Sequence, residues 1–241
     1  MPEFAYDLHI HSCLSPCGDE SMTPANIVNM AHLKGLDIIA ITDHNTALNA
    51  AAAIRAARDL PLTVLAGIEV TTAEEIHLLC LFPNAESAER AGEIIYGQLQ
   101  PVQNKPEYFG EQIIMDENEN VLGSIDLLLS NATNITYEQL PKIVGDFGGI
   151  CWPAHIDRPS NSVLSVFGVL PETPSFPVLE VHQPQSFFLG PENAVFRQNH
   201  KILCNSDAHI LGMISEREHF ISLSEPSFEA LKAALFSDKS E

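Results

Sequence analysis

The sequence is poor in positive charge. Its 241 residues include 12 lysines and arginines against 32 aspartates and glutamates, which gives a formal net charge of −20 at pH 7. Nucleic-acid backbones and anionic membrane surfaces are bound through clustered cationic side chains. We therefore expect this chain to bind neither a nucleic-acid backbone nor a membrane.

Long apolar runs are also absent. No stretch approaches the roughly 20 apolar residues that span a bilayer. The first residues, MPEFAYDLHIHS, lack the basic segment and following apolar run of a signal peptide. The five cysteines are scattered, which fits a reduced, cytoplasmic protein better than a disulfide scaffold. Cys13 and Cys17 are close enough in sequence to form a metal or redox pair, but no second pair follows at zinc-site spacing.

Strand-like and helix-like segments alternate along the chain, which is typical of a single α/β domain over residues 1–241. The run DIIAIT at 37–42 is apolar throughout, as in a strand buried on both faces. This alternation points to a parallel barrel or a doubly wound sheet. The other expected strands cover residues 4–10, 62–70, 76–82, 149–152, 178–181, 201–205 and 220–223.

Two stretches interrupt the alternation. Residues 101–123 contain QIIMDENENVLG, which predicts a hairpin with its turn at 117–120. We interpret it as an excursion from the repeating unit. Residues 158–177 carry four prolines and predict a long surface loop.

Histidines and carboxylates follow the predicted strands at similar positions. His9 and His11 are two apart on one strand, so both imidazoles point to the same face. Comparable groups stand at the ends of four other predicted strands, at 43–44, 69, 155 and 207–209. His77 differs because it begins its strand. The carboxyl ends of strands carry the active site in α/β barrels, and imidazole with carboxylate is a ligand set for zinc, manganese or iron.

These motifs occur in the order found in the polymerase and histidinol phosphatase (PHP) family, which the chain resembles over about residues 4–210. The residues that carry the resemblance are DLHIHS at 7–12, ITDHN at 41–45, GIEV at 67–70, PAH at 153–155 and SDAH at 206–209. The resemblance implies a distorted (β/α)7 barrel with a metal cleft at the carboxyl ends of its strands. It also implies two to three divalent ions, with zinc, manganese and iron all suited.

The resemblance further implies a ligand set. Glu69 would bridge two metals, and the complete set would be His9, His11, Asp19, His44, Glu69, His77, His155, Asp207 and His209. Asp19 is chosen because it stands four residues before the Thr23-Pro24 helix start, where the family carries an acid. The loop SPCGDE is longer than the usual one, and the neighbouring Glu20 is a competing ligand.

The function implied is that of a metal-dependent phosphoesterase acting on a small phosphorylated metabolite, such as a nucleotide. The expected nucleophile is a hydroxide bridging the metals at Glu69. Asp207 and His182 are candidates for the acid that protonates the leaving oxygen, and Arg158 is a candidate phosphate clamp because Arg pairs well with phosphate. An amidohydrolase-like hydrolysis by the same metals and a non-catalytic barrel that binds metal or a partner remain alternatives.

Overall fold

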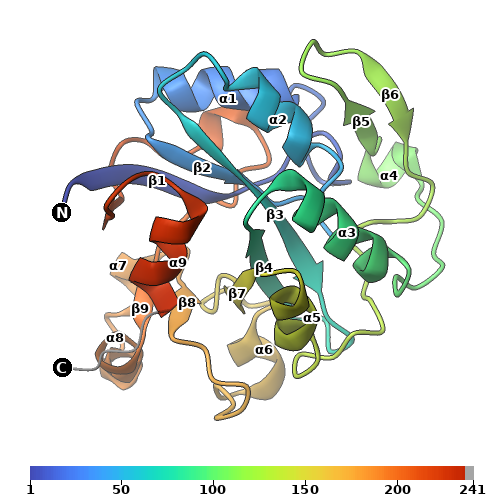
Figure 1. Cartoon of the computed structure of the whole chain (residues 1–241). Helices are drawn as coiled ribbons and strands as arrows, with labels where there is room; N and C mark the ends of the chain where they lie inside the picture. The colour runs from blue at the N-terminus through green and yellow to red at the C-terminus, as the bar shows by residue number, and fades with distance from the viewer. Residues whose placement is uncertain (237–241) are drawn as a thin grey trace.

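Ten strands form the frame of the molecule, and a computed structural model describes residues 1–236 of it (Figure 1). The expected strand positions are confirmed to within two residues at either end. The strands are β1 Glu3–Ile10, β2 Ile38–Ile41, β3 Thr63–Thr71, β4 His77–Phe82, β5 Ile113–Met115, β6 Val121–Ser124, β7 Ile150–Pro153, β8 Val178–Glu180, β9 Lys201–Leu203 and β10 Phe220–Ser222.

Seven of these strands surround the core in sequence order. β1, β2, β3, β4 and β7 are neighbours in one sheet, and β8 pairs with β9 in another. The two sheets are joined at both margins. The Ile156 amide donates to the Glu180 carbonyl at 2.9 Å, and Ile10 forms a parallel bridge with Ala208. The expected distorted (β/α)7 barrel is therefore confirmed, with β10 added outside β1 in antiparallel pairing.

The strands are not all parallel, which corrects the expectation of a parallel barrel or doubly wound sheet. β1, β2 and β3 pair in parallel, but β4 runs antiparallel to both β3 and β7. A short connection, residues 72–76, joins β3 to β4 and leaves no room for a crossover helix. As a result, the start of β4 lies at the same edge of the sheet as the end of β3.

The helices lie outside the strands, with α1 and α2 on one side and α5 and α6 at the opposite side (Figure 1). α1 begins as its sequence predicts, because the Thr23 hydroxyl accepts from the Asn26 amide at 3.1 Å and proline follows at the first helical position. The helices are α1 Pro24–Leu33, α2 Ala50–Ala56, α3 Ala85–Tyr96, α4 Pro106–Phe109, α5 Leu140–Asp146, α6 Val163–Phe167, α7 Pro184–Phe187, α8 Ala194–Asn199 and α9 Phe228–Phe236, with 3-10 turns at Pro191–Asn193 and Leu211–Met213.

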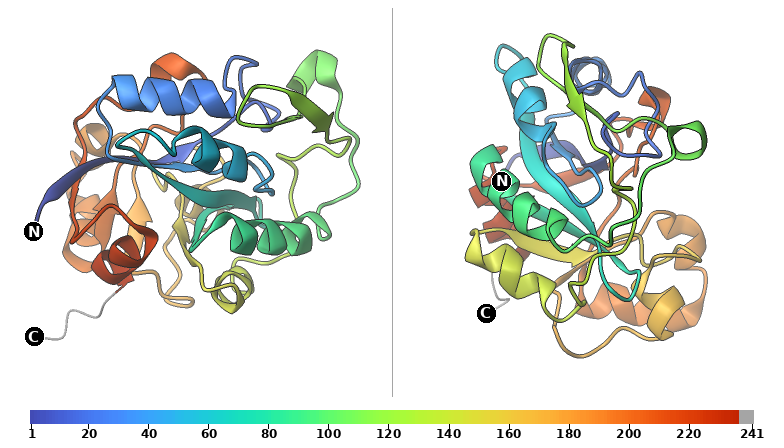
Figure 2. Two further views of the ribbon diagram at one scale, coloured as in Figure 1. Left: turned by 45° about the horizontal axis from the view of Figure 1, so that its top comes forward. Right: turned by 90° about the vertical axis from the view of Figure 1, so that its right-hand side faces the viewer.

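The expected hairpin is present as β5 and β6, and it stands at the periphery together with α4 (Figure 2). It is tied to the loop after β1, because the Ile113 amide donates to the Cys13 carbonyl at 3.0 Å. The expected loop at 158–177 is only partly correct. It contains α6, whose first turn is closed by a reciprocal capping box between Ser162 and Ser165.

One principal hydrophobic cluster runs through the strands and the helices that cover them. β2 is buried along its whole length, as its continuous apolar sequence predicts. None of the helices within residues 1–236 is long and apolar enough to cross a membrane. The assignment of residues 1–241 to a single domain stays a prediction.

Gly67 on β3 provides a test of the packing. A Cβ atom there would lie 2.7 Å from the side chains of Leu81 and Thr42 and 2.8 Å from the Cys80 carbonyl oxygen. We expect Gly67→Ala to lower the free energy of unfolding by about 1–3 kcal/mol, because these buried neighbours must move. Urea denaturation measures the change. The matched control is Gly123→Ala, where no neighbouring atom lies within 4 Å, and an equal loss in both variants would contradict the packing argument.

Candidate metal centre

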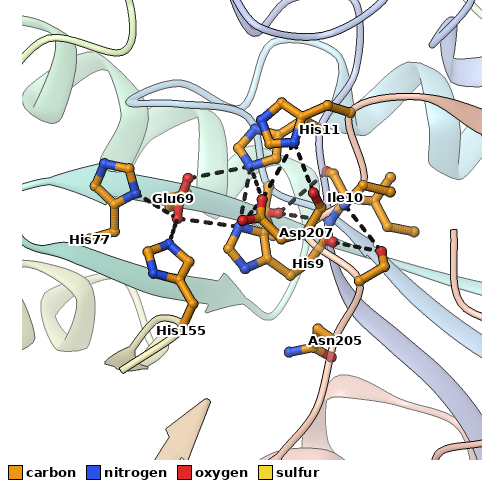
Figure 3. A network of polar contacts seen from close by, with 12 residues as sticks. His9, Ile10, His11, Glu69, His77, His155, Asn205 and Asp207 are labelled. Carbon is orange, nitrogen blue, oxygen red and sulfur yellow. Dashed lines mark hydrogen bonds and ion pairs between the residues drawn. The ribbon is translucent and has the colours of Figure 1, made fainter. Parts of the chain in front are cut away.

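The Glu69 carboxylate lies at the centre of a buried cluster of imidazoles, near the end of β3 (Figure 3). His77 Nδ1 and His155 Nε2 lie 2.9 and 3.0 Å from its Oε1 atom. His44 Nδ1 and His11 Nε2 lie 3.1 and 3.3 Å from its Oε2 atom. Burial alone would raise the pKa of Glu69, but the surrounding imidazoles outweigh burial and hold that pKa well below its ordinary value.

His9 on β1 and His11, the first residue after β1, both project into this cluster, as the alternation of an extended chain predicts. His9 Nδ1 lies 2.9 Å from a carboxylate oxygen of Glu180, which can only accept, so Nδ1 carries the proton. His11 Nδ1 lies 2.9 Å from the Ser15 hydroxyl, whose own proton is donated to Asp43 at 2.7 Å. Both rings therefore turn Nε2 towards the centre, and in the neutral ring this atom is the unprotonated one.

The facing acceptors fit a bound cation. The two Nε2 atoms of His9 and His11 are 3.2 Å apart, and Asp207 Oδ1 lies 3.4 and 3.2 Å from them. That oxygen has no hydrogen-bond partner of good geometry. Lone pairs this close repel one another unless a positive charge lies between them. Burial opposes a proton on His11, yet the carboxylates of Asp207 and Glu69 outweigh it and raise the pKa of His11 to about 9.

Three overlapping groups of side chains have ligand atoms within 4.8 Å of one another. They share members, so the ions they hold would be neighbours in one cleft. Nitrogen and carboxylate donors of this kind suit zinc, manganese or iron, and none of these is singled out. The groups are His9 with His11 and Glu69, His44 with Glu69 and His77, and His11 with His44 and His209.

The chain bends sharply where it delivers ligands to this cluster. His155 and Asp207 follow β7 and β9, and both have positive φ angles, of 28° and 51°. Asn45, one residue after His44, has a φ of 54°. For residues other than glycine, such conformations cost about 1–3 kcal/mol. They persist where contacts with the surrounding structure hold the backbone in place. Here they turn polar side chains back over the ends of the strands.

Glu180 supports two of the candidate ligands and lies outside the motifs that carry the family resemblance. It ends β8, is buried, and accepts from His9 Nδ1, from the His155 amide at 3.1 Å and from Asn205 Nδ2 at 2.6 Å. It therefore fixes the ring of one candidate ligand and the backbone of another. Such supporting contacts contribute tenfold or more to metal affinity in other metal sites. The available sequence signal was its place at a strand end.

Asp19 lies at the margin of the cluster. Its amide donates to the His209 carbonyl at 2.9 Å, but its exposed carboxylate accepts from the Ser21 amide at 2.9 Å. Among residues 1–236, neither Asp19 nor Glu20 joins the three ligand groups, and neither does Cys17. The ligand role of Asp19 stays a prediction, and it requires the carboxylate to leave Ser21.

Arg158 and His182 border the cluster on one side. Arg158 Nη2 lies 2.8 Å from Asp207 Oδ2, and its side chain lines a cavity of about 80 Å³ over the cluster. It also lines a cavity of about 630 Å³ next to it, together with His182. His182 does not reach the smaller cavity. The structure thus brings together all of the candidate site residues except Asp19 along one continuous surface.

The family model described as "PHP domain" matches residues 7–151, which is more than half of the chain. Among curated proteins, a 5′-3′ exoribonuclease of Haemophilus influenzae is 33% identical over 79 residues, which is 32% of this chain and 28% of that protein. This chain thus spans less than a third of that relative.

Solved structures show the same fold. The lesion-specific endonuclease Q of Pyrococcus furiosus matches 97% of this chain and 56% of its own, with a TM-score of 0.67 and 20% identity. A protein of Bifidobacterium adolescentis, proposed to be a metal-dependent phosphoesterase, matches 95% of this chain and 94% of its own, with a TM-score of 0.58 and 17% identity. At these identities the likeness concerns the fold.

We expect the purified protein to contain two to three divalent ions per chain after expression in metal-supplemented medium. The reason is the set of nitrogen and oxygen acceptors that face one another around Glu69. Divalent ions would supply the positive charge that these acceptors share. Elemental analysis by mass spectrometry measures the content, and dialysis against a chelator should remove the ions and lower the unfolding temperature. Fewer than one ion per chain, with no change on chelation, would contradict the assignment of a metal centre.

Proposed function

Because the chain belongs to the PHP domain family and holds a buried cluster of candidate metal ligands, we propose that it is a metal-dependent phosphoesterase whose substrate is a small phosphorylated molecule. The observation that carries the proposal is the placement of Arg158 between the Glu69 cluster and a cavity of about 630 Å³. A phosphate over the cluster would meet a guanidinium, and the remainder of the molecule would extend into the cavity. Charge-assisted, bidentate hydrogen bonds from an arginine are typical of phosphate recognition.

Divalent ions held by this cluster would lower the pKa of a bound water, polarise the ester and neutralise developing negative charge. The residues of the chain perform the remaining tasks. Glu69 keeps the imidazoles at one position, and a hydroxide derived from water beside it is the proposed nucleophile. Glu180 and Ser15 hold the rings of His9 and His11, so that the centre is organised before the substrate arrives.

We assign the proton donor for the leaving oxygen to His182. Asp207, the other candidate, has its two oxygens directed at the imidazoles of His9 and His11 and at Arg158, which suits an anchoring role. The imidazole of His182 lines the larger cavity, on the side where the leaving group would lie. An imidazole can supply the proton near neutral pH.

The charge distribution supports a small substrate rather than a polymer. Arg158 is the only lysine or arginine, among the residues described, that lines either cavity beside the cluster. Several other lysines and arginines contact groups away from these cavities. Lys34 contacts Glu216, Arg55 contacts Glu117, and Lys201 donates to backbone carbonyls of α9. A nucleic-acid strand would need further cations to neutralise its phosphates.

Glu69→Gln tests the centre. We expect phosphate release to fall at least ~100-fold, because the substitution keeps the volume but removes the negative charge shared by the imidazoles. Release from a panel of phosphomonoesters and phosphodiesters is measured alongside hydrolysis of amides and lactones. The control is Glu117→Gln, which changes an exposed ion pair and should leave rates unchanged.

Three results would contradict this proposal. Near-normal activity in a folded Glu69→Gln protein would remove Glu69 from the mechanism. Hydrolysis of amides or lactones, with no phosphate released from any ester by the unaltered protein, would favour an amidohydrolase-like reaction. Bound metal without any hydrolysis would favour a non-catalytic role.

Arg158→Ala tests the phosphate clamp. We expect the Michaelis constant for phosphomonoesters to rise about 10- to 100-fold, since charge-assisted hydrogen bonds contribute ~1.5–3 kcal/mol. A contact that strengthens in the transition state would lower turnover as well. Metal content is measured in parallel, because Arg158 also contacts Asp207. Arg55→Ala is the matched control, and equal kinetic constants in both variants would leave the clamp unsupported.

A further inference from the structure

The peripheral hairpin is tied to the interior by one buried side chain, that of Asn49. Its amide nitrogen donates to the Ile113 carbonyl at 3.0 Å, and its amide oxygen accepts from the Met115 amide at 3.0 Å. Both partners belong to β5, the inner strand of the hairpin (Figure 1). Asn49 stands at the N-cap of α2, where asparagine commonly caps a helix, yet its side chain makes no capping hydrogen bond. The side chain therefore serves the hairpin and not the helix.

The same amide also leads towards the metal centre. Asn49 Nδ2 donates to the Ser12 hydroxyl at 3.0 Å, and that hydroxyl donates its own proton to Asp43 Oδ2 at 2.6 Å. On the other side, Asp43 Oδ1 accepts from the Ser15 hydroxyl at 2.7 Å. Ser15 in turn accepts from His11 Nδ1 at 2.9 Å. Hydrogen bonds thus run from β5 to a candidate metal ligand without a break, and we call these five residues the Asn49 network.

The five residues of the network are completely buried. Hydrogen bonds in such a low-dielectric interior strengthen one another along a chain, so the loss of one member loosens the others. At the inner end, the Ser15 hydroxyl also accepts from the His44 amide at 3.2 Å. The network therefore reaches the ring of one candidate ligand and the backbone of another.

We propose that Asn49 and Ser12 are positioning residues through which the hairpin raises the metal affinity of the site that contains His11. The proposal rests on the metal centre of the proposed function, but it does not depend on which ester is cleaved. Asp43 can orient the Ser15 hydroxyl only while its own carboxylate is fixed. Ser12 fixes that carboxylate with its amide, at 2.7 Å, and with its hydroxyl. Asn49 holds the Ser12 hydroxyl against β5, so the hairpin becomes part of the support of the centre.

A double-mutant cycle between Asn49→Ala and Ser12→Ala tests the network. The readout is the dissociation constant for zinc, obtained by titrating chelator-treated protein in the presence of a competing chelator. We expect Ser12→Ala to raise this constant about 10-fold and Asn49→Ala, one hydrogen bond further away, about 3- to 10-fold, because contacts that support metal ligands contribute to affinity on this scale. In the Ser12→Ala background, Asn49→Ala should change it by less than about twofold.

The cycle separates a positioning role from simple anchoring of the hairpin. Asn49 contacts Ile113 and Met115 whether or not the Ser12 hydroxyl is present, so Asn49→Ala should lower the free energy of unfolding in both backgrounds. Anchoring alone would make its effect on zinc equal in both backgrounds as well. Positioning through Ser12 makes the effect on zinc disappear in the Ser12→Ala background, while the loss of stability remains.

Arg55→Ala is the matched control. Arg55 Nε lies 2.8 Å from Glu117 Oε2, so this ion pair holds the turn of the same hairpin from outside the network. We expect the zinc dissociation constant of the Arg55→Ala variant to equal that of the unaltered protein. A rise equal to that of Asn49→Ala would show that any loosening of the hairpin suffices, and would overturn the role of the network.

Ser12→Ala decides the question if Asn49→Ala does not fold, because it removes one hydroxyl and leaves the contacts of Asn49 with β5 in place. An unchanged zinc constant in folded Ser12→Ala protein, or an equal effect of Asn49→Ala in both backgrounds, would overturn the proposal. Zinc binding that follows the cycle, with no phosphate released from any ester, would refute the phosphoesterase function and retain the network. Absence of zinc binding by the unaltered protein would overturn both the metal centre and the network.

Discussion

The structure depends on one buried carboxylate among imidazole nitrogens. Glu69 is in the interior with five of these nitrogens 2.9–3.3 Å from its oxygens, and the Nε2 atoms of His9 and His11 face each other beside it. A buried charge that is not matched costs several kcal/mol, so this arrangement is stable only when cations or protons fill it. The strand ends, the strained loops and the supporting carboxylates all serve to hold these atoms in place.

The reversal of β4 is what makes the cluster compact. In an all-parallel barrel, a residue at the start of a strand would lie at the edge opposite the active site. Because β4 runs antiparallel to β3, its first residue pairs with the last residue of β3, and His77 reaches the Glu69 carboxylate. The apparent exception in the sequence pattern, a histidine at a strand start, is therefore a consequence of the topology.

The sequence predicted those parts of the molecule that repeat or alternate. The strands, the common face of His9 and His11, and the shared edge of the other candidate ligands follow from local periodicity. The complete ligand set was implied by the resemblance to the PHP family. The position of the Asp19 carboxylate was not predicted, because a neighbouring serine competes for it. The short helices α7 and α8 were also missed. Each has four to six residues, too few for a periodic pattern, and their packing around Phe187 depends on tertiary contacts.

The ion pair between Arg158 and Asp207 links the metals to the substrate. An arginine carries five donors, and one terminal nitrogen is engaged at 2.8 Å by Asp207, which leaves others to meet a phosphate. The carboxylate thus orients the guanidinium before an anion arrives, and the same carboxylate faces His9 and His11. In a chain with a net charge of −20, attraction of an anion cannot come from the protein as a whole. It must come from charges within about one Debye length, ~8 Å, of the cleft. The metal centre and this one arginine supply that local field, and a phosphate is attracted only where both act together.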